Sequence, residues 1–306
     1  MGVMDEKMES TRRTTDRSGL FIRGFSYVFI GAFALCCLLP FLLVLGTSFT
    51  SEASVKQSGF NFWPKEFSTF AYRIVLENPT QILGSYAVTI GITVVGTAIG
   101  LLIVAMTGYA LQRPDFLFRN KISFFIYFTT LFSGGLVPFY LLMTQYLHLK
   151  DNYLAILLPG LLSPFLIIMM KSFVRSIPHA ITESAKIDGA GDFTIFVKLI
   201  LPMTTPALAT IGLFIALGYW NEWYNSMLFL SSDMQFRPLQ LYLYNVVTKA
   251  DAIRNSAAAS NVPLSDVPIE TMKMAIAVIA TGPVILFYPF VQRYFIKGIT
   301  VGAVKG

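Results

Sequence analysis

Residues 85–111 read SYAVTIGITVVGTAIGLLIVAMTGYAL, a run of 27 residues without a charged side chain. A helix needs roughly 20 apolar residues to cross the hydrocarbon core of a bilayer. The composition of the whole chain agrees, since 55% of it is hydrophobic and 13% is charged, whereas soluble domains carry about 25% charged residues. The run therefore predicts a membrane-spanning helix.

Five further apolar runs of similar length share this pattern. They are 25–45, 122–147, 152–170, 203–230 and 274–292. Only the run 203–230 is interrupted by a charge, that of Glu222. A membrane barrel would show short alternating segments instead of solid apolar runs. The sequence predicts an all-α polytopic membrane protein with six transmembrane helices, which form a membrane domain of residues 24–296.

Prolines within or at the ends of these runs predict kinked helices, because proline removes a backbone donor. The third run also contains Ser133-Gly-Gly135 and, after it, Pro138. This combination either breaks the helix beside a pathway or lets two helices pack closely through small residues.

The positive charges predict which side of the membrane each connection faces. Nearly two thirds of the 23 lysine and arginine residues lie in residues 1–23, in the second-to-third and fourth-to-fifth connections, and in the tail. The positive-inside rule places these segments in the cytoplasm. Residues 1–23 are then a cytoplasmic N-terminal segment, 297–306 a cytoplasmic tail, and the first span an uncleaved anchor. No basic patch interleaved with aromatic residues indicates nucleic-acid binding.

The residue types that usually carry catalysis or metal binding are scarce. The two cysteines, Cys36 and Cys37, are adjacent within the first span, and His148 and His179 have no ligand spacing around them. The chain contains no Gly-x-x-x-x-Gly-Lys-Ser/Thr phosphate loop. We therefore predict no catalytic residue, no metal site and no cofactor bound by this chain.

The connection between the fourth and fifth spans carries a structured motif. It reads Ser176-Ile-Pro-His-Ala-Ile-Thr-Glu-Ser-Ala-Lys-Ile-Asp-Gly-Ala-Gly-Asp192. Ser176 can cap a helix whose first turn holds Pro178. Gly189 can adopt the left-handed conformation that ends this helix, and Asp192 can cap the next. The segment 176–202 thus predicts two short cytoplasmic helices joined at an elbow.

This elbow resembles the signature of the membrane subunits of bacterial ABC importers. The family pattern is Glu-Ala-Ala, three residues, Gly, nine residues, Ile, one residue and Leu-Pro. The matching positions here are Glu183, Ser184, Ala185, Gly189, Leu199, Leu201 and Pro202. Ser184 replaces the first alanine and Leu199 the isoleucine, while the spacing is kept throughout.

The resemblance implies that the elbow docks on a cytoplasmic ATPase subunit and couples ATP hydrolysis to transport. The implied coupling residues are Glu183, Ser184, Ala185, Asp188, Gly189, Ala190, Leu201 and Pro202. The alternative is an amphipathic linker that rests on the membrane surface. The implied partners are a second, related permease in a heterodimer, two ATPase subunits that use ATP and Mg, and an extracytoplasmic sugar-binding protein.

Two further segments, 219–225 and the tail 292–306, resemble the carbohydrate branch of these importers, specifically its second maltose-type permease. The resemblance implies a non-catalytic subunit in the bacterial cytoplasmic membrane, surrounded by lipid, that helps import an oligosaccharide. Within this branch, the chain most resembles permeases that import oligosaccharides or polysaccharide fragments.

An acid, amides and aromatic rings cluster where the fifth span is interrupted. We predict that Asn221, Glu222, Trp223 and Asn225 lie near the outward end of the substrate path. Aromatic faces stack on sugar rings and amides bind hydroxyl groups. On a continuous helix Asn221 and Asn225 would share a face. The alternative is an interfacial aromatic belt with Glu222 in solvent.

A proton-coupled secondary carrier for a small polar solute is the alternative function. Such a carrier needs titratable residues near the midplane, ideally in pairs. Glu222 is the single charged residue within the predicted spans. This scarcity favours the ATP-driven importer.

Overall fold

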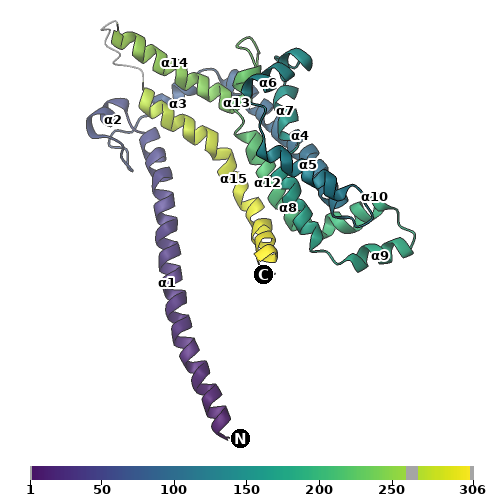
Figure 1. The fold of residues 1–306 in the computed structure, drawn as a ribbon. Helices are drawn as coiled ribbons and strands as arrows, with labels where there is room; N and C mark the ends of the chain where they lie inside the picture. Colours follow the sequence, from purple (N-terminus) through teal and green to yellow (C-terminus); the bar gives the residue numbers. More distant parts are fainter. Residues whose placement is uncertain (1, 260–267, 304–306) are drawn as a thin grey trace. The chain divides into compact units, whose positions relative to one another are not determined.

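The computed structural model describes residues 2–259 and 268–303 of the chain. Apart from one isolated bridge between Thr50 and Phe67, these residues are helical or irregular. Within the described ranges they form two compact units, one of residues 2–75 with 268–278 and one of residues 76–259 with 279–303. Figure 1 labels the helices of both units.

The first unit consists of a long apolar helix and short elements that follow it. Its helices are α1 (Gly2–Ser48), α2 (Glu52–Ser58), α3 (Phe70–Val75) and the beginning of α15 (Ile269–Ala303). Ser51 caps α2 by accepting a hydrogen bond from the Ser54 N–H at 3.3 Å. The Glu52 carboxylate accepts hydrogen bonds from the N–H and hydroxyl of Thr271, at 3.0 and 3.1 Å. Glu52 thereby satisfies free backbone donors at the N-terminus of α15, as helix ends require.

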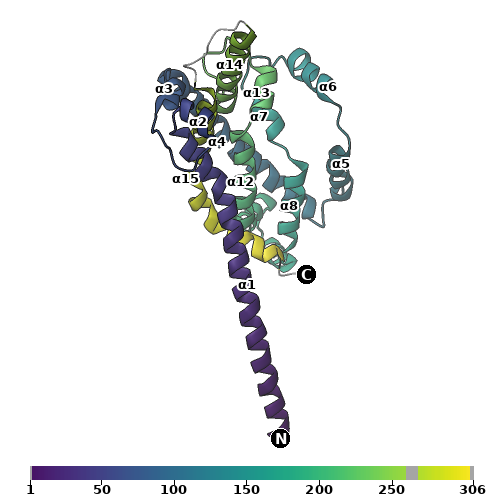
Figure 2. The ribbon, with the colours of Figure 1, turned by 90° about the vertical axis from the view of Figure 1, so that its left-hand side faces the viewer.

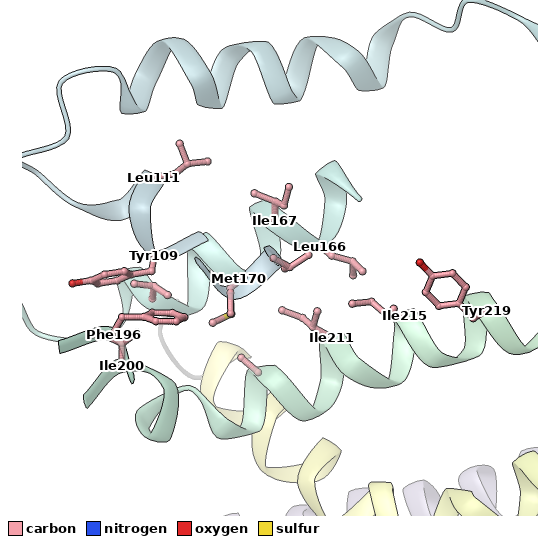
Figure 3. Close-up of a cluster of buried hydrophobic side chains, with 14 of the residues drawn as sticks. Tyr109, Leu111, Leu166, Ile167, Met170, Phe196, Ile200, Ile211, Ile215 and Tyr219 are labelled. Carbon is pink, nitrogen blue, oxygen red and sulfur yellow. The ribbon is translucent and has the colours of Figure 1, made fainter. Parts of the chain in front are cut away.

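Three helices form the core of the second unit. They are α4 (Pro79–Gln112), α8 (Pro164–Arg175) and α12 (Thr205–Trp220). Figure 3 shows side chains of all three meeting between the ribbons, with Met170 near Ile211. Tyr219 packs so closely on α4 and on Gly160 that only glycine fits opposite its ring. The Tyr219 hydroxyl also donates to the Leu157 carbonyl at 2.7 Å, which fixes α12 against the neighbouring helix.

Shorter helices surround this core. In chain order they are α5 (Arg119–Leu131), α6 (Leu136–Leu141), η1 (Leu142–Tyr146), α7 (Leu154–Gly160), α9 (His179–Ile187), α10 (Asp192–Ile195), η2 (Phe196–Ile200), α11 (Leu201–Met203), α13 (Tyr224–Phe229) and α14 (Leu239–Ala259). Within this unit, α9 and α10 lie at the opposite end from α6, α7 and α13 (Figure 1). The C-terminal part of α15 joins the unit through its Ile279 and Ala280 carbonyls, which accept from Tyr86 and Trp220.

Three described helical segments are long and apolar enough to cross a membrane, and up to six if each bent pair counts as one span. The three are Phe21–Ser48, Pro79–Gln112 and Ile269–Leu286. The bent pairs are 119–131 with 136–146, 154–160 with 164–175, and 192–203 with 205–220, at angles of 114°, 42° and 83°. The chain is therefore an all-helical membrane protein in its described parts, and the count of six spans stays a prediction.

Of the two interpretations of Ser133-Gly-Gly135, a helix break or close helix packing, the structure shows the break. Residues 132–135 are irregular between α5 and α6, and Gly135 has a φ of 87°. Figure 2 shows this irregular connection at the edge of the second unit. Only glycine adopts such a φ readily, so the glycine pair allows the sharp turn.

Helix α14 lies outside the six predicted spans. The small polar residues 255–261, which are typical of a flexible loop or a helix end, include the end of α14 at Ala259. Residues 260 and 261 of that stretch lie outside the described residues. The helix is fixed at its beginning, where the Leu239 N–H donates to the Thr89 hydroxyl at 2.8 Å. This contact joins residues far apart in the chain and has no local signature.

Candidate functional site

The elbow begins where α8 ends. Ser176 has helical backbone angles, and its hydroxyl donates to the Phe173 carbonyl at 2.7 Å. It therefore closes α8, and the prediction that it caps the next helix is wrong. Pro178 precedes α9 instead, where the lack of an N–H costs nothing because the first donors of a helix have no internal partner.

Gly189 ends α9 as predicted, with a φ of 81°. The Ala190 N–H returns to the Ala185 carbonyl at 2.9 Å, and the Gly189 N–H to the Lys186 carbonyl at 3.0 Å. These bonds satisfy carbonyls at the helix end. A Cβ atom on Gly189 would meet nothing within 4 Å. The requirement for glycine is therefore one of backbone conformation and not of space.

Asp192 occupies a different position from the predicted cap. Helix α10 begins at Asp192 itself, and Gly191 precedes it without a side-chain cap. The Asp192 carboxylate lies 2.8 Å from the Arg113 guanidinium instead. The ion pair competes with the cap for the same carboxylate and prevails here.

Four charged side chains form a closed ring around this turn, which we call the ionic ring: Arg113, Asp115, Lys186 and Asp192. Arg113 binds both Asp115 and Asp192, and the Lys186 ammonium lies 2.8 Å from Asp115 and 3.9 Å from Asp192. The hydrogen bonds from Arg113 and then Lys186 hold the pKa of Asp115 well below its usual range. The hydrogen bond to Asp115 raises the pKa of Lys186.

The elbow has a packed side and an exposed side. Ala185, Ala190 and Leu201 pack on the hydrophobic core of the second unit. The other predicted coupling residues, Glu183, Ser184, Asp188, Gly189 and Pro202, are exposed. Two apolar side chains are exposed beside them, namely Ile187 at 87% and Phe193 at 69%. The elbow therefore forms a compact projection, or knob, that packs on the core through one side and exposes the apolar side chains of Ile187 and Phe193 on the other.

A cavity of about 200 Å³ lies between this knob and the end of α4. Tyr109 and Arg113 line it from α4 and the turn that follows, and His179, Glu183 and Lys186 line it from α9. Sequence reasoning missed the contribution of Tyr109 and Arg113, because they lie about 70 residues before the elbow and outside its motif.

Residues 112–301 match the model of the family described as binding-protein-dependent transport system inner membrane component. The chain belongs to this family. Residues 112–301 include the ionic ring, the elbow and the interrupted fifth span, whereas Tyr109 lies just before the matched residues.

Relatives of this transport permease match nearly its whole length. The polygalacturonan/rhamnogalacturonan transport system permease protein YtcP of Bacillus subtilis is 39% identical over 280 residues, which cover 92% of this chain and 96% of YtcP. Protein LplC of Bacillus subtilis is 38% identical over 281 residues, covering 91% of this chain and 93% of LplC.

A solved structure shares the fold of the permease. It is the crystal structure of a bacterial ABC transporter involved in the import of the acidic polysaccharide alginate, with a TM-score of 0.76 and 34% identity. The match covers 91% of this chain and 98% of that chain. The permease is thus an inner-membrane component of an ABC importer, as the elbow motif suggested, and the proton-coupled carrier is not favoured.

The second predicted site of the permease lies where the fifth span is interrupted. Helix α12 ends at Trp220 and α13 begins at Tyr224, so Asn221 and Asn225 do not share one continuous helical face. That part of the prediction is wrong, because the Asn221 amide donates back to the Leu217 carbonyl at 2.9 Å and closes α12.

Glu222 bridges the interruption. Its carboxylate accepts from the Asn225 N–H at 2.8 Å and from the Asn225 side-chain amide at 3.0 Å. Trp223 stacks on Tyr244 with ring centroids 5.0 Å apart. The four predicted residues are therefore close together, and each already has an intramolecular partner for its polar groups or ring.

A cavity of about 320 Å³ lies beside this interruption. Among the four predicted residues only Glu222 lines it, together with Ser163, Phe165, Phe214 and Tyr219. Aromatic rings next to a hydroxyl and a carboxylate are the chemistry that binds a sugar. Sequence reasoning missed Ser163 and Phe165, because the bend between α7 and α8 brings them to α12.

Proposed function

We propose that this permease forms a heterodimer with a second, related permease and passes an oligosaccharide into the cytoplasm. An extracytoplasmic binding protein delivers the sugar, and two separate ATPase subunits hydrolyse ATP with Mg. The observation that carries the proposal is the likeness, over nearly the whole chain, to YtcP and to the alginate importer. YtcP is named for polygalacturonan and rhamnogalacturonan and the other for an acidic polysaccharide, which supports an oligosaccharide as the substrate.

The elbow of residues 176–202 is the proposed contact with the ATPase. Ile187 and Phe193 are exposed beside the motif residues, and an exposed apolar pair needs cover when it lies outside lipid. The positive-inside rule supports a cytoplasmic place for this end of the permease. Six spans and cytoplasmic termini belong to the same proposal.

Glu222 and its cavity are the proposed place where the sugar path meets this subunit. The cavity volume of about 320 Å³ suits a ligand of the size of a sugar unit. Asn221, Trp223 and Asn225 then act mainly by holding the interruption open beside it. Substrate contacts from the second permease complete the path.

Purification of the co-expressed complex tests the proposal. The permease should copurify with its second permease and an ATPase pair, and the complex in proteoliposomes should take up short oligogalacturonides only with ATP and binding protein. Uptake by this chain alone under a pH gradient would contradict the proposal. An Ile187→Cys variant should cross-link to the ATPase, whereas an Ile90→Cys variant, exposed on α4, should not.

Variants at the cavity test the sugar path separately. Phe214→Ala should weaken oligogalacturonide uptake, since loss of one aromatic stacking contact costs about 0.5–1.5 kcal/mol, while basal ATP hydrolysis remains. Normal uptake by this variant would place the sugar contacts in the second permease.

A further inference from the structure

Arg113 connects the end of one core helix to both sides of the elbow turn. It follows Gln112, the last residue of α4, and its guanidinium reaches Asp192 at 2.8 Å, three residues after Gly189. Through Asp115 it also reaches Lys186, three residues before Gly189. The ionic ring thus spans the left-handed turn and connects it directly to α4. The polypeptide chain itself connects the elbow only to α8 and α12.

An aromatic layer lies under the ionic ring. The Arg113 guanidinium stands 5.9 Å from the centre of the Tyr109 ring, and Tyr109 stacks on Phe196 with centroids 5.5 Å apart. Figure 3 shows Tyr109 and Phe196 side by side. Tyr109 belongs to α4 and Phe196 to η2, which directly follows α10. The end of α4 is therefore joined to α10 by charges and to η2 by rings.

The alternative connections from the elbow to the core run along the chain. Towards α8 the elbow passes through the irregular residues 176–178, and towards α12 it passes through the π-helical turn η2 and the short α11. Irregular and π-helical segments yield more easily than a continuous helix. Helix α4, by contrast, is continuous over 34 residues and ends directly at Arg113.

We infer that Arg113 is a positioning residue that transmits the displacement of the docked elbow directly to α4. The inference rests on the proposed docking of the elbow on an ATPase. The ring side chains are partly exposed, so their ion pairs add little to folding stability in water. The ion pairs instead fix the geometry of the turn. The planar guanidinium holds Asp115 and Asp192 in one arrangement, which a flexible lysine at the same position would not do.

A fluorescent reporter on α4 tests the inference without any sugar. In a background with Cys36 and Cys37 replaced by serine, bimane attached at Val94→Cys reports α4, and at Ile168→Cys it reports α8. Both positions are exposed, at 61% and 40%. The assembled complex with its ATPase pair is trapped with ATP and vanadate, and the shift in bimane emission is measured.

Arg113→Gln should reduce the ATP-dependent shift at position 94 at least about twofold and leave the shift at position 168 unchanged. Arg113→Lys should give an intermediate shift. Asp192→Asn should also reduce the shift at position 94. The double variant Arg113→Gln with Asp192→Asn should reduce this shift no more than Arg113→Gln alone, since the effects of residues in one ion-pair network are not additive. Lys121→Gln is the control, because Lys121 is exposed on α5, outside the elbow, and forms no ion pair within the described part of the chain.

Equal shifts at position 94 in Arg113→Gln and the unmodified chain would overturn the inference, and so would additive losses in the double variant. Copurification of the ATPase separates this from the proposed function. If the ATPase copurifies with both the Arg113→Gln variant and the unmodified permease and the shift at position 94 persists in the variant, the ring does not transmit the displacement. If the ATPase binds neither, the docking itself is wrong.

Discussion

Glu222 accepts two hydrogen bonds from Asn225, one from its backbone N–H at 2.8 Å and one from its side-chain amide at 3.0 Å. The two residues lie on either side of the point where α13 begins. A carboxylate in this position satisfies a free donor of the helix and opposes the positive end of its dipole. Glu222 therefore holds the interruption of the fifth span in place in addition to lining the cavity.

We expect Glu222→Ala to destabilise the purified permease by about 0.5–2 kcal/mol, the range for loss of a helix cap. Glu222→Gln keeps one acceptor for the Asn225 N–H and should lose less. Thermal unfolding in detergent measures both. Equal stability of the alanine variant and the unmodified chain would show that the two hydrogen bonds do not hold α13.

Gly189→Pro should abolish coupling while the protein still inserts into the membrane. Proline fixes φ near −65°, and Gly189 needs a φ of 81°. Transport and stimulated ATP hydrolysis should both fall. Gly191→Ala is the control, since Gly191 has a φ of −69° and open space around its Cβ position. Normal uptake by a well-expressed Gly189→Pro variant would argue against docking through the elbow.

Gly96→Ala should destabilise the second unit, because the new Cβ would overlap the ring of Tyr219. Overpacking of this kind costs about 1–3 kcal/mol. Gly91→Ala on the same helix meets nothing within 4 Å and should be neutral or slightly stabilising. A comparison of the two melting temperatures tests the packing of Tyr219 on α4.

The orientation predicts that a cysteine at Ser256 reacts with an impermeant thiol reagent outside intact cells. A cysteine at Thr182 should react only after the membrane is opened. Both are made in a background without Cys36 and Cys37. The reverse labelling pattern would refute the orientation and, with it, the cytoplasmic docking of the elbow.

Coupling through the ionic ring should not depend on pH near neutrality. The pKa of Asp115 lies below its ordinary value of 3.8, so its contribution is complete above that value and is lost only as the pH falls through the lower pKa of the folded protein. The ratio of coupling in Asp115→Asn to that in the unmodified chain should stay constant from about pH 6 to pH 8. A ratio that changes over this range would mean that Asp115 titrates there.

The sequence predicted those features that local chemistry decides. The apolar run 85–111 lies within α4, Gly189 adopts the left-handed conformation, and Gly135 allows the break after α5. In each case one residue or one run determines the conformation. The interruption at Glu222 was also visible, because a charge within an apolar run is costly in lipid and so marks a break in the span.

Contacts between segments that lie far apart in the chain could not be predicted from the sequence. Ser176 and Asp192 both looked like helix caps, and each is engaged elsewhere, by the Phe173 carbonyl and by Arg113. Nothing near residue 192 indicates that an arginine almost 80 positions earlier will reach it. The same holds for Ser163 and Tyr219, which meet at one cavity only after α7 and α8 bend.

The ionic ring also affects the long-range electrostatic attraction between the elbow and an approaching protein. Its two positive groups, Arg113 and Lys186, are matched by its two negative groups, Asp115 and Asp192. Paired opposite charges cancel beyond about a Debye length, roughly 8–10 Å in physiological salt. The ring therefore exerts almost no long-range pull on an approaching protein. As far as the ring is concerned, the encounter proceeds by ordinary diffusion, and its rate should change little with ionic strength.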